Sequence, residues 1–382
     1  MLSKRNHSLK KYISTKILAL MVIVFVGGCQ NQGIDLGNND IEREVQEGLV
    51  LSNATLEQSN HDGQSFWRLQ IEKITYSQDN KMATVEGITG NLLENGEIVL
   101  KISAERGEVI NDGEQIYLQG EILAVDSRND VEIRGEKLDW KPEDNYLVMT
   151  ENIEVNHTQL RLTTEEIKYY TNAQILELNN NIIAHTQEPN LNIKTNFLVW
   201  QIEEEKVSAP EPITIDRYEN ETITDRLSAD RGEIDLEKKI VVFRNNIDYQ
   251  SLNPQIQGSA REIIWDYENR IVETDQMIQL VQIDENIRMK GNSGKVDLTE
   301  NKVYLRNSIY GEAAEDEAKL YADSVVWNLD NQNIDARGNV FYQQLNPPFN
   351  FRGDRAQGRL QDKMVKVTGT RTHKVVTTIY TD

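Results

Sequence analysis

This 382-residue chain has few residues whose types and spacing are typical of a catalytic site. Histidines could hold a metal ion or act as a general base, but the five here are scattered without metal-ligand spacing: His7, His61, His157, His185 and His373. The acidic pair Glu165-Glu166 and the run 203–205 suit acid–base chemistry, yet they are more typical of solvated turns. No G-x-S-x-G elbow or phosphate loop occurs. The sequence therefore predicts a protein that is not an enzyme and binds neither metal nor cofactor.

The single cysteine, Cys29, has a different chemistry available. It follows a basic head and a short apolar run, 17–26, which together are typical of an export signal. The tetrapeptide "VGGC" resembles the bacterial lipobox, in which the cysteine is acylated after cleavage. We therefore predict a lipoprotein signal peptide at 1–28, lipidation of Cys29 and a linker at 29–49. An uncleaved membrane helix is the alternative.

The charge of the chain excludes one class of partner. It carries 41 basic and 62 acidic side chains, a formal net charge of −21. Because a phosphate backbone is bound through positive charge, nucleic acid is not an expected ligand. Hydrophobic residues make up 38% of the chain, which is low for a thick globular core and suits a thin, sheet-rich shape.

Most of the chain is a tandem repeat, so the repeated elements must position any side chains that bind a ligand. Units of about 31 residues begin at 103, 134, 163, 194, 228, 259, 290, 321 and 352. Apolar residues recur at fixed places in each unit, as Val241, Phe243 and Ile247 do in the fifth, and the residues between them are mixed and often polar. Spacings of two and four on one face indicate strands. We expect an all-β, elongated tandem-repeat fold of about nine two-strand units, whose two facing antiparallel sheets bury the aliphatic columns.

A second, inward column holds large aromatic residues. Four of the five tryptophans occupy the seventh position of alternate units: Trp140, Trp200, Trp265 and Trp327. Together with Leu118, Phe243 and Leu305 of the first apolar column, they are the candidate lining of an apolar slot between the sheets. The alternative, that these side chains only fill a closed core, stays open.

Three stretches near the N-terminus carry a family resemblance. "DGQSFWRLQIEKITY" (62–76), "ENGEIVLKISAERGEV" (94–109) and "IYLQGEILAV" (116–125) resemble the opening of the LptC family of lipopolysaccharide-transport proteins, and the later units resemble the related LptA/OstA repeats. The matching positions are Gly63, Trp67, Leu69, Tyr76, Gly96, Ala104, Gly107, Leu118 and Gly120. The resemblance implies a periplasmic β-jellyroll with an open groove that holds acyl chains, joined end to end with other jellyrolls.

On this basis we expect an N-terminal LptC-like jellyroll at 50–225 and a C-terminal OstA-like jellyroll at 226–382. The resemblance implies a non-enzymatic lipid-transfer function. It also implies lipopolysaccharide or another glycolipid as ligand, and an Lpt-type ABC transporter with other Lpt jellyrolls as partners. It favours the inner membrane for the anchor, whereas Gln30 after the cysteine favours the outer one. The alternatives are a structural envelope scaffold and, far behind, a carbohydrate-active β-solenoid enzyme.

Overall fold

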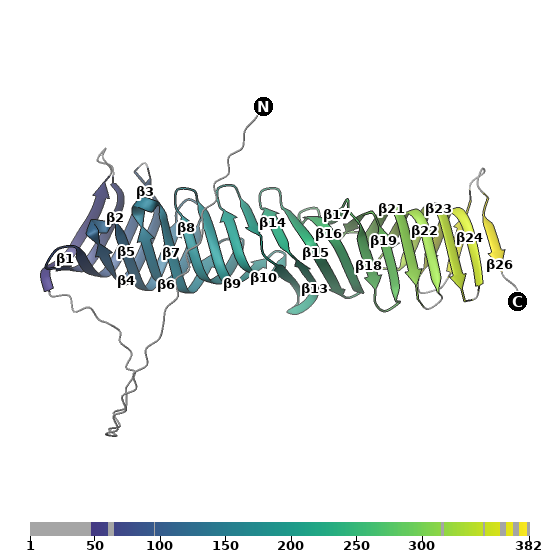
Figure 1. Cartoon of the computed structure of the whole chain (residues 1–382), viewed down its shortest axis with the longest axis horizontal. Coiled ribbons are helices and arrows are strands. Elements are labelled where there is room, and N and C mark those ends of the chain that lie inside the picture. The colour runs from purple at the N-terminus through teal and green to yellow at the C-terminus, as the bar shows by residue number, and fades with distance from the viewer. Residues whose placement is uncertain are drawn as a thin grey trace, which may run out of the picture. The chain divides into compact units, whose positions relative to one another are not determined.

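The computed structural model describes residues 47–59, 65–94, 96–314, 317–346, 348–359, 364–369 and 374–379. The described strands belong to one compact unit, 46–382. All 26 join one antiparallel sheet, and Figure 1 shows them following one another from β1 to β26. The all-β repeat fold predicted from the columns is confirmed.

The first half of the sheet consists of long strands and two short 3-10 turns. Their bounds are β1 (Glu47–Ser59), β2 (Ser65–Ser77), β3 (Met82–Glu94), β4 (Glu97–Ile110), η1 (Asn111–Gly113), β5 (Gln115–Asp126), β6 (Val131–Lys141), η2 (Pro142–Asp144), β7 (Tyr146–Asn156), β8 (Leu160–Tyr170), β9 (Ile175–Gln187) and β10 (Asn190–Gln201).

Shorter strands alternate with long ones in the second half. Their bounds are β11 (Lys206–Ala209), β12 (Ile213–Glu219), β13 (Thr222–Ala229), β14 (Arg231–Asp235), β15 (Ile240–Leu252), β16 (Gln255–Asp266), β17 (Ile271–Thr274), β18 (Ile278–Gln282), β19 (Ile287–Gly291), β20 (Ser293–Asp297), β21 (Lys302–Ala313), β22 (Ala318–Asn328), β23 (Asn333–Leu345), β24 (Pro348–Arg359), β25 (Met364–Thr368) and β26 (Val376–Ile379).

A row of corners divides the long strands into two arms. In β15 the register with β16 shifts between Arg244 and Ile247, and the two residues passed over, Asn245 and Asn246, have left-handed φ values of 62° and 47°. Equivalent left-handed pairs occur at 120–121, 151–152, 180–181, 307–308 and 338–339. Because such a bulge bends a strand, each long strand contributes one arm to each layer. We expected one strand per unit in each sheet. The two layers instead belong to a single continuous sheet.

Hairpin turns form the two long edges of this folded sheet. Edge A consists of the turns at 78–81, 111–114, 142–145, 171–174, 202–205, 236–239, 267–270, 298–301 and 329–332. Edge B consists of those at 127–130, 157–159, 188–189, 220–221, 253–254 and 283–286. Backbone hydrogen bonds connect successive turns of edge A, for example from the amide of Leu236 to the carbonyl of Glu205 at 2.8 Å. The edges are therefore ordered rows.

The core lies between the two layers and forms three clusters along the array. The first spans residues 67–207, the middle one 191–263 and the third 256–356. Contact across the core is direct, because Trp67, on the edge B arm of β2, meets Trp140, on the edge A arm of β6, with ring centroids 6.2 Å apart. The predicted domain boundary at 225/226 stays a prediction.

Candidate functional site

The predicted lining residues all point into the core but lie in different clusters. Leu118, Trp140 and Trp200 belong to the first cluster, and Leu305 and Trp327 to the third. Phe243 is in the middle cluster, with the half-buried Trp265 packed against it. All except Trp265 are at most 2% exposed. The inward orientation predicted from alternation is thus observed, whereas contact with a lipid stays a prediction.

The interior is less completely buried in the middle of the array than in its first part. Ile116, Leu147 and Leu176 of the first cluster have no exposed surface, whereas Ile215 and Ile263 of the middle cluster are 9% and 8% exposed. The chain is also interrupted at 210–212, beside this cluster, and at 275–277, at the start of the third, although β15 between them keeps its two-residue bulge. Unlike the first and third clusters, the middle one therefore contains no buried residue that is completely shielded.

Three of the four tryptophans in the inward column have an unused hydrogen-bond donor. The indole Nε1 atoms of Trp200, Trp265 and Trp327 are buried and have no hydrogen-bond partner within the described chain. Trp67, by contrast, donates from Nε1 to Oε1 of Gln58 at 2.8 Å. Since an unpartnered buried donor costs about 1–3 kcal/mol, these three indoles offer polar contacts to a ligand with oxygen atoms near its apolar chains.

Edge A and edge B approach each other along a seam, which is closed in the first part of the array. Trp67 packs its ring against Gly113 in an edge A turn, where φ is +99° and an added Cβ would lie 2.4 Å from the ring. His157, in an edge B turn, meets the ring of Trp200 near edge A at 5.2 Å. Burial lowers the pKa of His157, so the ring that covers the tryptophan is neutral at pH 7.

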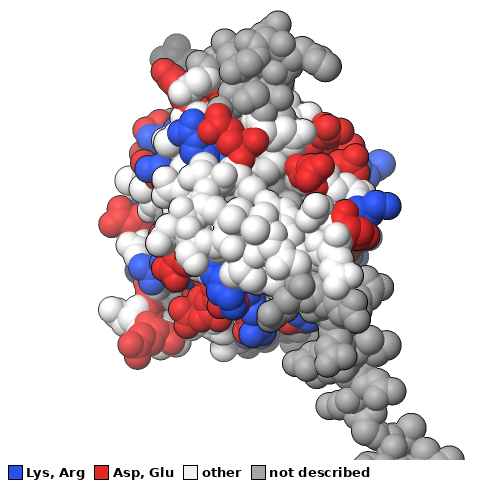
Figure 2. All heavy atoms as spheres, turned by 90° about the vertical axis from the view of Figure 1, so that its left-hand side faces the viewer, with Lys and Arg blue, Asp and Glu red and all other residues white. Residues whose placement is uncertain are grey.

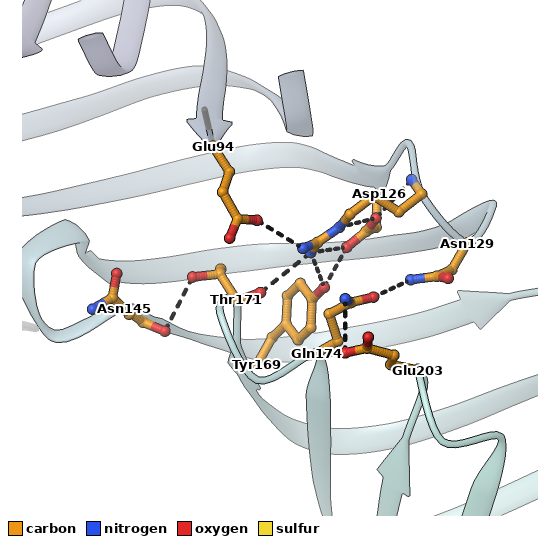
Figure 3. A network of polar contacts seen from close by, with 9 residues as sticks. Glu94, Asp126, Asn129, Asn145, Tyr169, Thr171, Gln174 and Glu203 are labelled. Atoms are coloured by element: carbon orange, nitrogen blue, oxygen red, sulfur yellow. Dashed lines mark hydrogen bonds and ion pairs between the residues drawn. The ribbon is translucent and has the colours of Figure 1, made fainter. Parts of the chain in front are cut away.

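Between these two contacts lies a polar network that joins the edges (Figure 3). Asp126, at the end of β5, is 2% exposed and accepts a hydrogen bond from the hydroxyl of Tyr169, on β8. Arg128 pairs with Asp126 at 2.7 Å and donates to the Tyr169 hydroxyl at 3.0 Å. It also donates to the Thr171 carbonyl at 3.2 Å. The edge B turn is thus bonded directly to edge A.

Amide side chains extend the network along the seam. Asn129 donates to Oε1 of Gln174 at 2.8 Å, and Gln174 donates to Glu203 at 3.4 Å. We name the six residues that join the two edges the seam latch: Asp126, Arg128, Asn129, Tyr169, Thr171 and Gln174. A further contact, from Arg128 to Glu94 at 3.4 Å, lies toward solvent.

The charges of the seam latch follow from its surroundings. Burial, and then the Asp126 carboxylate, raise the pKa of Tyr169 well above its usual value, so the phenol stays protonated and donates. The hydrogen bond to Asp126 raises the pKa of Arg128, which remains a cation. The buried carboxylate therefore has two donors from side chains that are fixed in their donating forms.

Sequence reasoning missed the seam latch. The edge B turn "DSRND" (126–130) has the composition of an ordinary polar connection, and its partners are some 43 residues further along the chain. One signal was available: at the seventh position of its unit, Tyr169 stands where the alternate units have Val109, Ile234 and Val296. A buried tyrosine hydroxyl generally needs a partner, so this substitution indicates a polar group facing it.

The remaining sequence predictions concern the leader, metal binding and a membrane-spanning helix. Cys29, the signal peptide and the linker up to residue 46 lie outside the described residues. Within the described ranges, no three His, Cys, Asp or Glu side chains gather as a metal site would require. No helix in the same ranges has the length and apolar character to cross a bilayer.

The first strand presents an apolar edge. Within the described chain β1 pairs only with β2, and Leu49, Val50 and Leu51 are 56%, 47% and 36% exposed. Figure 2 shows this end of the strand unit, where uncharged side chains cover the middle and charged ones surround them. Since an unpaired strand is a template for pairing, this end is suited to receive another strand.

The fold and the site define an all-β repeat protein with an apolar interior and a polar seam. Residues 16–181 match the family described as Lipopolysaccharide-assembly, LptC-related. The match confirms the resemblance of the N-terminal part of the chain to the LptC family, whereas the resemblance of the later units to LptA/OstA repeats stays a prediction. No curated protein matches the chain.

Proposed function

We propose that the protein is a non-enzymatic transfer component for lipopolysaccharide or a related glycolipid, whose acyl chains it binds between the two layers. The LptC-related segment supports a part in lipopolysaccharide transport. The observation that carries the proposal is the apolar interior, which extends through three consecutive clusters from residue 67 to residue 356. Such an interior offers a path along the array rather than a single pocket.

The physical chemistry of an acyl chain suits this interior. Each buried methylene contributes about 0.8 kcal/mol, so a chain of ordinary length gains several kcal/mol without any specific residue. We place the first binding segment in the middle cluster, around Phe243 and Trp265, because none of its buried residues is completely shielded and Trp265 is only half-buried. The unpartnered indole of Trp265 could donate to an ester or hydroxyl oxygen of the same lipid.

The two ends and the leader have roles in the same proposal. Exposed strand β1 at one end and strands β25 and β26 at the other can pair with strands of other jellyroll proteins, which would lengthen the path. An acylated Cys29 would hold the chain at the periplasmic face of a membrane. The inner membrane follows from the family and the outer one from Gln30.

A structural scaffold is the second candidate, and one observation favours it. The first cluster is packed so closely that Ile116, Leu118 and Trp140 are at most 1% exposed, as in an ordinary protein core. A protein that only spanned or spaced the envelope would need no more than this.

Photo-crosslinking at inward and outward positions separates the two candidates. A diazirine analogue of leucine at Leu305, which is buried, should capture added lipopolysaccharide several-fold more than the same group at the adjacent outward Tyr304, since alternate side chains face opposite sides of a strand. Equal capture at the two positions indicates surface contact. Absence of capture at Leu305 and at Phe243 contradicts lipid transfer and favours the scaffold.

A further inference from the structure

The two edges of the array are held together by a different kind of bond from the strands. Neighbouring strands share a continuous backbone ladder that runs along the array. Across the seam at 126–129 and 169–174, every hydrogen bond has a side-chain donor. The edges can therefore separate at this level without breaking a ladder bond.

The seam latch combines a buried anchor with a part that water reaches. Asp126 and Tyr169 are almost fully buried, whereas the side chain of Arg128 is 21% exposed and that of its outer partner Glu94 is 51% exposed. Water at the mouth of the seam can replace the partners of Arg128 as they separate, which lowers the cost of opening. A fully buried network would have no such route.

The latch occupies only part of the seam. Between residues 201 and 330 of the described chain, no hydrogen bond or ion pair joins edge A to edge B. This stretch includes the middle cluster, none of whose buried residues is completely shielded. The seam thus has a bonded segment and an unbonded one in the same molecule.

We propose that the seam latch is a gate, which keeps the first cluster closed to lipid and admits acyl chains there only when Arg128 and Asn129 release edge A. This inference rests on the proposed function, because it concerns the passage of the same glycolipid. It assigns a positioning role to these six residues, of which Tyr169 also belongs to the first cluster.

The test uses the full-length chain with a diazirine leucine analogue at Leu118, in the first cluster, or at Leu305, in the third. The outward controls are Tyr117 and Tyr304, the preceding residue in each case. The latch is weakened by Asn129→Ala with Gln174→Ala, which leaves the Asp126–Arg128 pair intact. It is locked by Asn129→Cys with Gln174→Cys in a Cys29→Ser background, oxidised or reduced.

With purified lipopolysaccharide as the probe, we expect the weakened latch to raise capture at Leu118 about tenfold. The oxidised lock should reduce it to the level of Tyr117, with recovery on reduction. Capture at Leu305 should be the same in all variants. Equal capture at Leu118 in the weakened, wild-type and locked proteins overturns the gate, whatever Leu305 shows.

Amide hydrogen exchange tests the gate without any lipid. The weakened latch should speed exchange in 127–130 and 171–174 about tenfold and leave 241–243 unchanged. If no position captures lipid but exchange at the two turns becomes faster, lipid transfer is contradicted, whereas opening of the seam is supported. Unchanged exchange at the two turns overturns the gate itself.

Discussion

At the scale of single residues, the hydroxyl of Tyr169 matters because it donates to a carboxylate that has almost no contact with water. Replacing Tyr169 by Phe removes one of the two side-chain donors to Asp126 and should lower the free energy of unfolding by about 1–3 kcal/mol. The neighbouring Tyr170 faces outward and donates to Glu177, so Tyr170→Phe should change stability by less than about 0.5 kcal/mol. Urea denaturation of both variants measures the difference, and equal effects would show that the buried bond contributes nothing special.

The same phenol predicts how stability responds to alkali. Burial raises the pKa of Tyr169 and of Tyr249, whose hydroxyl bonds to Asp225, above the unfolded value of about 10. A raised folded pKa stabilises the protonated form, so this contribution is complete below pH 10 and is lost as the pH rises. Above pH 10 each tyrosine should lower the unfolding free energy by about 1.4 kcal/mol per pH unit.

Thermal or urea unfolding between pH 9 and pH 12 checks this dependence. The variant with Tyr169→Phe and Tyr249→Phe should show a shallower loss of stability than the wild-type protein over the same range. If the two proteins lose stability in parallel, the buried hydroxyls do not control the alkaline limit.

At the scale of elements, the corners decide whether a strand can serve both layers. Asn246 has a φ of 47° and donates to Asp230 at 2.9 Å. Asn246→Gly and Asn246→Val both remove this hydrogen bond, but only valine meets the steric penalty of the left-handed region. We expect the valine variant to be less stable than the glycine variant by about 1–2 kcal/mol. Differential scanning calorimetry of the pair measures it, and equal stabilities would mean that the corner is not strained.

The strands were predictable from sequence because inward and outward residues alternate along each arm. The corners were not, since the spacing of four between Phe243 and Ile247 fits a straight strand equally well. The left-handed Asn245-Asn246 pair between them is the feature that distinguishes the two cases. The seam latch was beyond such reasoning, because only the folded sheet brings Asp126 to Tyr169. The inward positions of Leu118 and Trp140 followed from periodicity, whereas the looser packing around Trp265 did not.

At the scale of the whole strand unit, the exposed edge at β1 should control association with other strands. Replacing Val50, which is 47% exposed, by Lys puts a charge on the edge and should weaken end-to-end pairing. Tyr321→Lys places a charge at a similarly exposed position, 43%, on a strand that is paired on both sides. Sedimentation velocity over a range of concentrations should show reduced self-association for Val50→Lys alone. Identical behaviour of the two variants would contradict pairing through β1.

The single continuous sheet also determines how the strand unit would respond to mechanical tension. Antiparallel hydrogen bonds are perpendicular to the strands, so a force that separates β1 from β26 pulls every ladder bond along its own direction. The successive pairs of neighbouring strands carry this force in series. The pair of neighbouring strands with the fewest bonds gives way first, and the shortest ladder joins β10 to β11 and β12, through three and four paired residues. Because hairpin turns keep the chain covalently continuous, each strand pair that separates lets the chain extend, by roughly 80 Å for a hairpin of about 25 residues. A unit tethered at both ends would therefore extend in steps under tension while its two ends stayed covalently connected.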